Sequence, residues 1–324
     1  MLLFVNWLLT NFIMNDYWFV IINPTSGNGK SKKYISKIIN TINKEKINFQ
    51  YAITEYANHE FEITQKQIKK GCKKFISVGG DGTLHNIING IFNQSIIATS
   101  KIKIAVIPVG TGNDWVKNYG ISKNISKNIA TIKQENTTTQ DIGKITFTKD
   151  NTVVYFNNLA GIGFDGHVVN SINKYKKLGS LSYLIGVLTG FSTYKSKQLK
   201  IEFNDLEIKV KSLMTLIGLC KYSGGGMRLT HNSNPNDGFF DISIIKHLSL
   251  GVVLLNILKL FNGKIINHSK VKTYKTKEIS VSIEGTSLPF IQADGELINS
   301  GNFNVSLLPK AIQVIIPKKM LNIS

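Results

Sequence analysis

A strand-like segment, a glycine-rich turn and a helix-like segment follow one another three times in the first 120 residues. The strand-like segments span 17–22, 74–78 and 102–107. The turns that end them span 23–29, 79–82 and 108–112. Helix-like stretches occupy 30–42, 60–70 and 84–92. Because strands alternate with crossover helices, this half is predicted to form an open, mostly parallel α/β sheet.

The three glycine-rich turns predict a phosphate-binding edge on this sheet. In an open α/β sheet, ligands bind beyond the carboxyl ends of the strands, which is where these turns lie. Glycine lets backbone N–H groups approach phosphate oxygens closely, and a helix N-terminus adds a partial positive charge. Three such turns in one sheet therefore predict a pocket for phosphate groups.

Several common site patterns are incomplete in this chain. Pro24 stands where a Walker A loop needs the glycine that precedes Gly29-Lys30-Ser31. The GxGxxG match at 161–166 falls in the β-rich half, and residue 186 is glycine where a dinucleotide fold needs an acid. Ser26 has no evident His/Asp partner for serine hydrolysis. The six histidines show no i, i+4 pairing, so they predict no zinc site.

After about residue 141 the pattern changes to short alternating or β-branched runs separated by turns. These runs span 141–160, 199–219, 238–246 and 277–305. They predict a mainly antiparallel β domain, interrupted by two apolar helix candidates at 178–194 and 248–261. We expect the α/β domain over 15–138, with 306–324 as a candidate completing segment, and the β domain over 139–305.

Charge narrows the range of partners. The chain carries 39 Lys+Arg against 20 Asp+Glu, a net charge of +19, and Arg228 is its only arginine. Base readout in nucleic acids depends on the arginine fork, so nucleic acid is not an expected partner. The expected partners of such a basic protein are then an anionic membrane surface or a polyanionic small substrate. Cys72 and Cys220 are too few for a disulfide framework or a zinc cluster, which favours an intracellular protein.

No window of the sequence offers 18 consecutive apolar residues, which excludes a multispanning membrane protein. Residues 1–13 are apolar and uncharged, yet they are too short to span a bilayer and lack the basic flank of a signal peptide. Two interpretations of this segment stay open: a start assigned upstream of the native one at Met14, or a weak membrane-surface anchor.

The glycine-rich turns, taken with motifs in the second half, resemble those of diacylglycerol kinases and sphingosine-type lipid kinases. The matching segments, in order, are Asn23-Pro24-Thr25-Ser26-Gly27, Gly79-Gly80-Asp81-Gly82-Thr83, Gly110-Thr111-Gly112-Asn113-Asp114, Asn158 through Gly163-Phe164-Asp165, Gly224-Gly225-Gly226-Met227 with Asp237-Gly238, and Ala293-Asp294-Gly295-Glu296. The likeness covers nearly the whole chain from Tyr17. A lone GGDGT also occurs in NAD kinases, but the combination is far more specific.

The resemblance implies that ATP binds between an α/β domain and a β-sandwich domain and that a lipid hydroxyl is phosphorylated. It implies a set of nucleotide contacts: Asn23, Pro24, Thr25, Ser26, Gly27, Thr54, Gly79, Gly80, Asp81, Gly82, Thr83, Leu84, His85, Asn86, Thr111 and Asp114. It implies Mg²⁺ ligands at Asp237, Asn234 and the Phe239 backbone carbonyl. A water-mediated acidic network would be formed by Asp81, Asp114, Asp165 and Asp294.

Glu296 is the candidate general base, which would take the proton of the lipid hydroxyl as its oxygen attacks the γ-phosphorus. Asp294, two residues earlier, would then point to the same side of a strand and share the site. The alternative interpretation is a solvated hairpin turn, because Asp-Gly is a strong turn former. Lys30 and Ser31 either help to hold phosphate or form a solvated first helical turn.

Access to a lipid is the last question that the sequence addresses. The stretches 178–194 and 248–261 either line an acyl-chain pocket and touch the bilayer or pack in the core. Lysines flank the first of them: Lys174, Lys176, Lys177, Lys195 and Lys197. Because lysine is attracted to anionic lipid, we expect transient contact with an anionic membrane surface and a cytoplasmic protein peripheral at the inner membrane face.

The sequence therefore predicts an ATP- and Mg²⁺-dependent lipid kinase, with diacylglycerol as the expected substrate and phosphatidic acid as the product. The identity of the lipid alcohol stays open, and a homodimer through a sheet edge is a further possibility. Two alternatives remain: an NAD-kinase-like enzyme, and a non-catalytic regulator that binds nucleotide or lipid on the same fold.

Overall fold

The fold is described from a computed structural model, which covers residues 16–110, 113–172, 190–191, 194–231, 233–285 and 287–320. The chain divides into two compact units, which we describe separately. Unit 1 holds the described residues up to Gly110, then Tyr119–Thr139, and those from Ala311 onward. Unit 2 holds Gln140–Lys310 together with helix α5 (Asp114–Asn118). Two of the unit boundaries therefore fall within strands, β5 (Thr137–Phe147) and β15 (Phe303–Ile315), and the other two lie on either side of the segment that contains α5.

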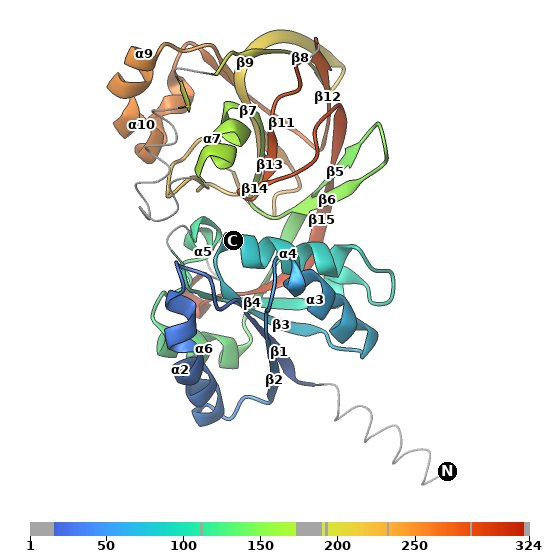
Figure 1. Cartoon of the computed structure of the whole chain (residues 1–324), viewed down its shortest axis with the longest axis vertical. Coiled ribbons are helices and arrows are strands. Elements are labelled where there is room, and N and C mark those ends of the chain that lie inside the picture. The colour runs from blue at the N-terminus through green and yellow to red at the C-terminus, as the bar shows by residue number, and fades with distance from the viewer. Residues whose placement is uncertain are drawn as a thin grey trace. The chain divides into compact units, whose positions relative to one another are not determined.

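Unit 1 is a parallel sheet covered by helices on both faces (Figure 1). Its strands are β1 (Trp18–Ile22), β2 (Phe49–Ile53), β3 (Lys74–Gly79), β4 (Lys103–Pro108) and the end of β15. Its helices are α2 (Lys30–Lys44), α3 (His59–Lys69), α4 (Asp81–Phe92) and α6 (Ile125–Gln134). The strand order is β2-β1-β3-β4-β15, and the α/β class predicted from the sequence is confirmed.

The two faces of this sheet bury alternate side chains of the same strands. Trp18, Val20 and Ile22 of β1 pack with Ile38 and Ile42 of α2 in a core cluster that also includes α6. Helices α3 and α4 cover the opposite face. Every residue of β1 is buried, as expected for a parallel strand covered on both sides. Each fully buried isoleucine adds roughly 1.5–3 kcal/mol to the free energy of unfolding relative to an exposed one.

Unit 2 is built from antiparallel strands, so the predicted β-rich half is also confirmed. Its strands, besides parts of β5 and β15, are β6 (Val153–Phe156), β7 (Leu159–Gly163), β8 (Lys197–Phe203), β9 (Leu206–Gly218), β10 (Phe240–Lys246), β11 (Val271–Thr276), β12 (Glu278–Glu284), β13 (Ile291–Ala293) and β14 (Glu296–Leu297). The long strand β9 pairs with β8, β7 and β10. Phe156 and Phe240, both fully buried, stack in the interior of unit 2, with ring centroids 5.8 Å apart.

Short helices lie on unit 2. These are α5, α7 (Phe164–Ile172), α9 (Leu250–Leu255) and α10 (Ile257–Asn262), with a 3-10 turn at Lys264–Asn267. The apolar stretch predicted at 248–261 is therefore two helices, divided at Asn256, rather than one. The stretch predicted at 178–194 lies almost wholly outside the described residues, as do residues 1–13. No helix among the described segments is long and apolar enough to cross a membrane.

One ion-pair group in unit 1 gives a test of stability. Glu135 accepts hydrogen bonds from the ammonium groups of Lys74, at 2.8 Å, and Lys103, at 2.7 Å. Burial by itself would raise the pKa of Glu135, but the two lysines outweigh it and hold this pKa below its usual value of 4.5. Because the folded-state pKa is depressed, the stabilisation is present above about pH 4.5 and is lost as the pH falls through the folded-state value.

We expect Glu135→Gln to lower the free energy of unfolding by about 1–2 kcal/mol at pH 7, because two charge-assisted hydrogen bonds are weakened. The difference from wild type should disappear in acid, below the folded-state pKa of Glu135. Urea unfolding, which adds no screening salt, over a pH series from 7 downward measures both. Glu45→Gln is the control, since its pair with Lys133 is more exposed, with 53% of the lysine side chain accessible. An equal effect of both variants at pH 7 would contradict the prediction.

Candidate active site

The carboxyl ends of the unit 1 strands bring the glycine-rich turns together. Asn23 follows β1, and its backbone N–H donates to the Val78 carbonyl of β3 at 3.0 Å. Its side-chain oxygen accepts from the N–H and the hydroxyl of Thr25, at 3.0 and 2.8 Å, which closes the first turn. Thr54 follows β2, and its N–H donates to the carbonyl of Ile22 at 2.9 Å. Thr54 therefore lies beside the start of the first turn.

Small residues allow the turns to approach one another. The hydroxyl groups of Ser26 and Thr83 lie 3.4 Å apart and join the first turn to the first turn of α4. A Cβ added to Gly27, whose φ is +64°, would stand 3.2 Å from the Cα of Gly110 in the third turn. A Cβ on Gly79 would lie 2.6 Å from the Cβ of Thr83. A larger residue at Gly27 would therefore push the first and third turns apart, and one at Gly79 would displace the start of α4 from the end of β3.

Helix α4 begins earlier than the sequence predicts. The expected start was residue 84, but α4 runs from Asp81, with Gly80 as its N-cap. Gly82 and Thr83 thus belong to its first turn, whose N–H groups and partial positive charge favour an anion. The half-buried Asp81 occupies the same turn.

Two of the predicted nucleotide contacts point into the protein instead. The side chain of Leu84 is 1% exposed and that of His85 is 6% exposed. The His85 ring lies 3.3 Å from the Asn89 amide, one turn further along α4. These side chains pack in the core, and whether the backbone of these two residues contacts nucleotide stays a prediction. Thr111 lies outside the described residues.

Glu60 links two of these segments, a role that no sequence pattern indicated. Its side chain is only 2% exposed, in the first turn of α3. One carboxylate oxygen accepts from the Asn23 amide at 2.9 Å and the other from the Asn86 amide at 3.3 Å. Glu60 therefore fixes the first turn relative to α4. Partners 37 and 26 residues away make such a role invisible in a local pattern.

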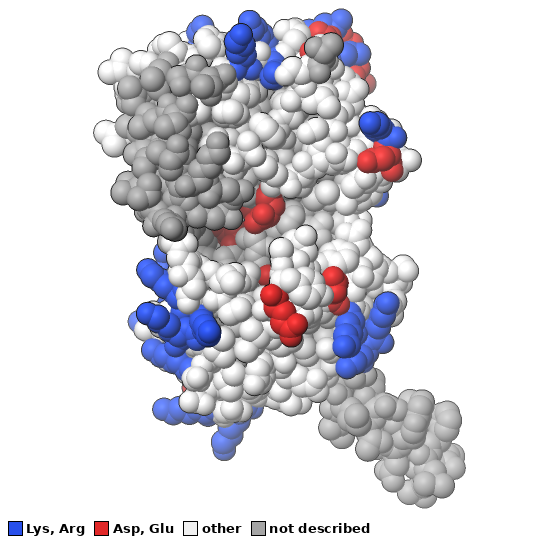
Figure 2. All heavy atoms as spheres, viewed as in Figure 1, with Lys and Arg blue, Asp and Glu red and all other residues white. Residues whose placement is uncertain are grey.

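Basic side chains lie close to these turns. Lys30, Lys32, Lys33 and Lys37 are exposed on α2, which begins directly after the first turn. Figure 2 shows lysine side chains gathered over the part of unit 1 where α2 lies in Figure 1. A groove of about 690 Å³ is lined by Pro24, Thr25, Asn28, Gly29, Lys32, Ile35 and Ile53. A polyanion at the turns would therefore meet positive charge and a partly apolar wall.

In unit 2, Asp114 joins two of the motifs that carry the family resemblance. Its carboxylate accepts from the N–H of Gly225 at 2.7 Å and pairs with the Lys117 ammonium. Gly225 has a φ of +88°, a conformation that glycine adopts without strain. The side chain of Asp114 is buried, so it holds the loop of residues 224–227 in place. Whether it also contacts nucleotide stays a prediction.

Asp294 is held by the backbone of another segment. Its carboxylate accepts from the N–H groups of Asn157 at 3.1 Å, Asn158 at 2.8 Å and Leu159 at 3.2 Å. The side chain is 8% exposed. These three donors connect the turn after β13 to the start of β7. These contacts indicate that the Asp294 carboxylate positions the β13–β14 turn relative to the start of β7.

The predicted placement of Asp294 and Glu296 on one strand is wrong. Ala293 pairs with Glu296, so residues 294 and 295 form a two-residue hairpin turn between β13 and β14. Both have positive φ, +53° and +86°, which suits the Asp-Gly sequence of a type I′ turn. The hairpin interpretation of this motif was therefore right about the backbone. Asp294 is turned into the protein, whereas Glu296 is exposed.

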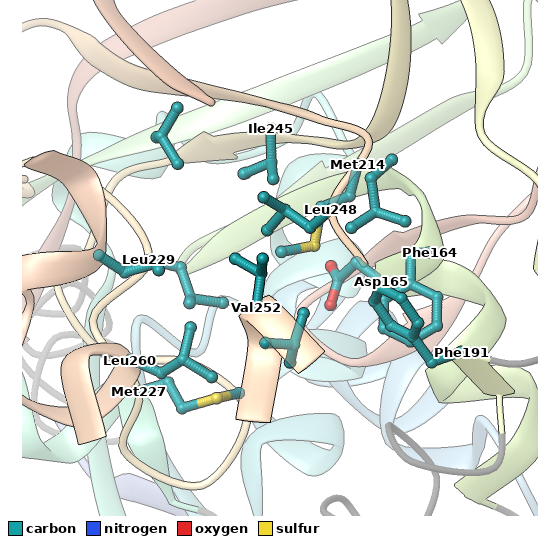
Figure 3. A pocket seen from close by; sticks show the side chains of 14 residues that line it. Phe164, Asp165, Phe191, Met214, Met227, Leu229, Ile245, Leu248, Val252 and Leu260 are labelled. Carbon is teal, nitrogen blue, oxygen red and sulfur yellow. The ribbon is translucent and has the colours of Figure 1, made fainter. Parts of the chain in front are cut away.

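Asp165 lies at an apolar cavity in unit 2, shown in Figure 3. It sits in the first turn of α7, and its carboxylate accepts from the side-chain amide of Gln292. Gln292 also accepts from the N–H of Gly295 at 2.8 Å, so it links Asp165 to the β13–β14 turn. The rest of the lining is apolar: Phe164, Phe191, Leu213, Met214, Met227, Leu229, Ile245, Leu248, Val252, Val253, Leu260, Ile265 and Val271.

The predicted metal ligands lie in one loop before β10. The Asp237 carboxylate accepts from the Phe239 N–H at 3.0 Å and pairs with the Lys275 ammonium at 2.7 Å. The loop itself is anchored by the buried Asp141, which accepts from the N–H groups of Gly238 and Lys310. Burial raises the pKa of Asp141. The described residues contain no cluster of three His, Cys, Asp or Glu side chains suited to a metal.

The donor chemistry of this loop nevertheless fits a hard cation, because carboxylate, amide and carbonyl oxygens are the ligands that Mg²⁺ prefers. Nearby, one oxygen of the buried Asp241 carboxylate has no hydrogen-bond partner within the described structure. In such a site Asp237, Asn234 and the Phe239 carbonyl would hold Mg²⁺, and the cation would compete with the Lys275 ammonium for the Asp237 carboxylate.

Comparison with known proteins matches both halves of the chain. Residues 17–145 match the family described as "Diacylglycerol kinase catalytic domain", and residues 158–316 match the "YegS C-terminal NAD kinase beta sandwich-like domain". This chain belongs to the diacylglycerol kinase catalytic domain family. The resemblance inferred from the motifs is thereby confirmed. Members of this family are lipid kinases, and family membership implies the use of ATP.

Relatives of this diacylglycerol kinase family member cover nearly its whole length. A Staphylococcus epidermidis protein named diacylglycerol kinase is 29% identical, covering 94% of this chain and 93% of its own. The Bacillus subtilis protein YtlR, named as a candidate lipid kinase, is 26% identical, covering 92% and 99%. A solved Bacillus anthracis structure titled as a diacylglycerol kinase shares the fold, with a TM-score of 0.70 at 20% identity, covering 94% and 98%.

Proposed function

We propose that this lipid kinase transfers the γ-phosphate of ATP to the free hydroxyl of diacylglycerol, giving phosphatidic acid and ADP. Unit 1 would bind the nucleotide and unit 2 the lipid. The observation that carries the proposal is that one chain contains two unlike sites. Unit 1 has glycine-rich turns that meet at the carboxyl ends of its strands beside exposed lysines, and unit 2 has an apolar cavity with a carboxylate in its wall. Triphosphate and acyl chains need these two environments.

Unit 1 supports nucleotide binding through its backbone. N–H groups of the first turn and of the start of α4 would donate to phosphate oxygens, and the lysines of α2 would balance their charge. Asn23, Glu60 and Thr83 would act indirectly, by holding these turns in register. Bound Mg²⁺ would neutralise charge on the transferred phosphate.

Glu296 is the proposed general base. In the transfer step, the lipid hydroxyl oxygen attacks the γ-phosphorus, the bond from this phosphorus to the bridging oxygen breaks, and ADP leaves with that electron pair. The hydroxyl proton passes to the Glu296 carboxylate. Glu296 suits this task because it is exposed on a hairpin whose turn is fixed by Asp294 and Gln292. Asp294 is proposed as a positioning residue.

The test is an assay of purified protein with γ-labelled ATP and a panel of acceptors in mixed micelles, with and without Mg²⁺. We expect labelled phosphatidic acid from diacylglycerol, and less product from sphingosine or a plain long-chain alcohol. Label in NADP when NAD is the acceptor would favour the NAD-kinase-like alternative. Nucleotide binding without transfer to any acceptor would favour a regulator. A cytoplasmic location and self-association through a sheet edge stay predictions of the sequence.

A further inference from the structure

Three large apolar side chains are exposed close together on α9 and α10. Leu255 is 86% exposed, Leu258 76% and Phe261 49%. They recur every third residue across the break at Asn256. Single exposed apolar residues are ordinary on a soluble surface, but several in seven residues of two short helices indicate a contact surface. We refer to Leu255, Leu258 and Phe261 as the outer face of α9–α10.

Other residues of the same segment face the apolar cavity. Val252, Val253 and Leu260 line it, together with Ile265 of the following turn (Figure 3). Helices α9 and α10 therefore form part of the cavity wall while their outer face is open to solvent. This arrangement differs from that of an ordinary surface helix, whose outward side chains are polar.

The cavity is nearly closed in this structure. It offers about 60 Å³, whereas sites for drug-sized ligands have roughly 300–1,000 Å³. Acyl chains can therefore enter only if part of the wall moves. The wall has residues suited to such a change, because Met214 and Met227 are flexible side chains that adapt to different neighbours. Helices α9 and α10, which supply three of the lining side chains, are only six residues long each.

The charged side chains of the segment that carries the outer face have one sign. The 36 residues from 242 to 277 contain seven lysines and no aspartate or glutamate. Lys259 on α10, Lys264 in the 3-10 turn and Lys270 before β11 are exposed. Apolar side chains bordered by lysines match the composition of a bilayer surface, where acyl chains lie beneath anionic headgroups.

From these observations we propose that α9–α10 is the surface by which this protein docks on an anionic lipid bilayer, and that docking opens the adjacent cavity to lipid. Leu255, Leu258 and Phe261 enter the acyl region, and the neighbouring lysines contact headgroups. Because the opposite face of the helices lines the cavity, their movement into the bilayer connects the cavity with the membrane interior. The substrate then passes from bilayer to cavity without exposing its chains to water.

The inference rests on the proposed function for the identity of the cargo, but the docking surface can be tested by itself. The variant is Leu255→Ser/Phe261→Ser, which leaves the cavity lining intact. The control is Leu206→Ser, whose wild-type side chain is 49% exposed on the β8–β9 hairpin of the same unit. The probes are sedimentation with vesicles of phosphatidylcholine alone and with 30% phosphatidylglycerol, and thermal unfolding as a check on folding.

We expect wild type and the Leu206 control to bind the anionic vesicles and to be released by high salt. The double variant should bind at least about tenfold more weakly, because each buried methylene adds a several-fold factor to membrane partitioning. In the single variant Leu258→Trp, brominated lipids should quench tryptophan fluorescence more than they do in wild type. Equal vesicle binding by all variants, or no added quenching, would overturn the proposal, as would a dimer that the double variant abolishes without any change in vesicle binding.

Kinase activity separates the two proposals. With a short-chain diacylglycerol below its micelle concentration, the double variant should phosphorylate as fast as wild type, whereas with vesicle-borne diacylglycerol it should be slower by a similar factor to its loss of binding. If no lipid is phosphorylated by wild type but the vesicle results hold, the proposed function fails and the docking surface stands. If activity on vesicle-borne lipid is unchanged in the double variant, the coupling of docking to the cavity is wrong.

Discussion

Replacement of Glu296 by glutamine should lower kcat for lipid phosphorylation by about 10²–10⁴-fold, the usual contribution of a general base. The amide preserves the shape of the side chain but cannot accept the hydroxyl proton. KM for ATP should change little, because the residue acts on the acceptor. Stability should also be unchanged, since the side chain is exposed in β14. Initial rates at saturating ATP in mixed micelles, beside a thermal unfolding curve, measure these quantities.

The matched control is Glu284→Gln, which removes an exposed carboxylate at the end of β12 in the same unit. It should retain wild-type kcat. A Glu296→Gln enzyme with more than about a tenth of wild-type kcat would exclude this residue as the base, since the lower bound for general-base catalysis is about a hundredfold. The proton would then have to be accepted by another group.

Asp294 should prove important for a different reason. We expect Asp294→Gly to lower the free energy of unfolding by about 3–5 kcal/mol, because three buried backbone donors lose a charged acceptor. Glycine is chosen because φ at this position is +53°, where alanine would add backbone strain of its own. Guanidinium unfolding of the variant and wild type gives the difference.

Asp294→Asn separates the individual bonds. Asparagine tolerates the same φ and keeps one acceptor oxygen for the N–H groups of Asn158 and Leu159, while the N–H of Asn157 loses its acceptor. A smaller loss of about 1–3 kcal/mol is therefore expected. If both variants were as stable as wild type yet inactive, Asp294 would be a catalytic group, as the sequence suggested, rather than a positioning residue.

Part of the fold could be predicted because its signals are local. The buried strands β1, β3 and β4 are continuous apolar runs that end in glycine turns, and the sequence located each to within a residue or two. Strand β2 was missed, since its residues Phe49–Ile53 are half-exposed at the sheet edge and show no apolar run. Helix α4 starts at Asp81, three residues before its predicted start, because Asp81, Gly82 and Thr83 are helical although glycine-rich sequence of this kind is typical of a turn.

The candidate site was predictable in its loops and less so in its side chains. In a parallel sheet the carboxyl ends of all strands lie at one edge, so three glycine turns must meet there whatever the details of packing. The orientation of Leu84 and His85 is a different matter, because the helix face that they occupy is decided by what α4 packs against. A motif position alone does not distinguish a ligand contact from a core residue.

The sequence by itself determined the order of the phosphate-binding turns, the change from α/β to antiparallel β structure and the excess of lysine, because each of these is a property of neighbouring residues or of composition. Tertiary structure decided which carboxylates are buried and held and which are exposed. Glu60 joins residues 37 and 26 positions away, and Asp294 binds a segment 135 to 137 positions away. Hydrogen bonds over such separations depend on how strands pair, which no local pattern encodes.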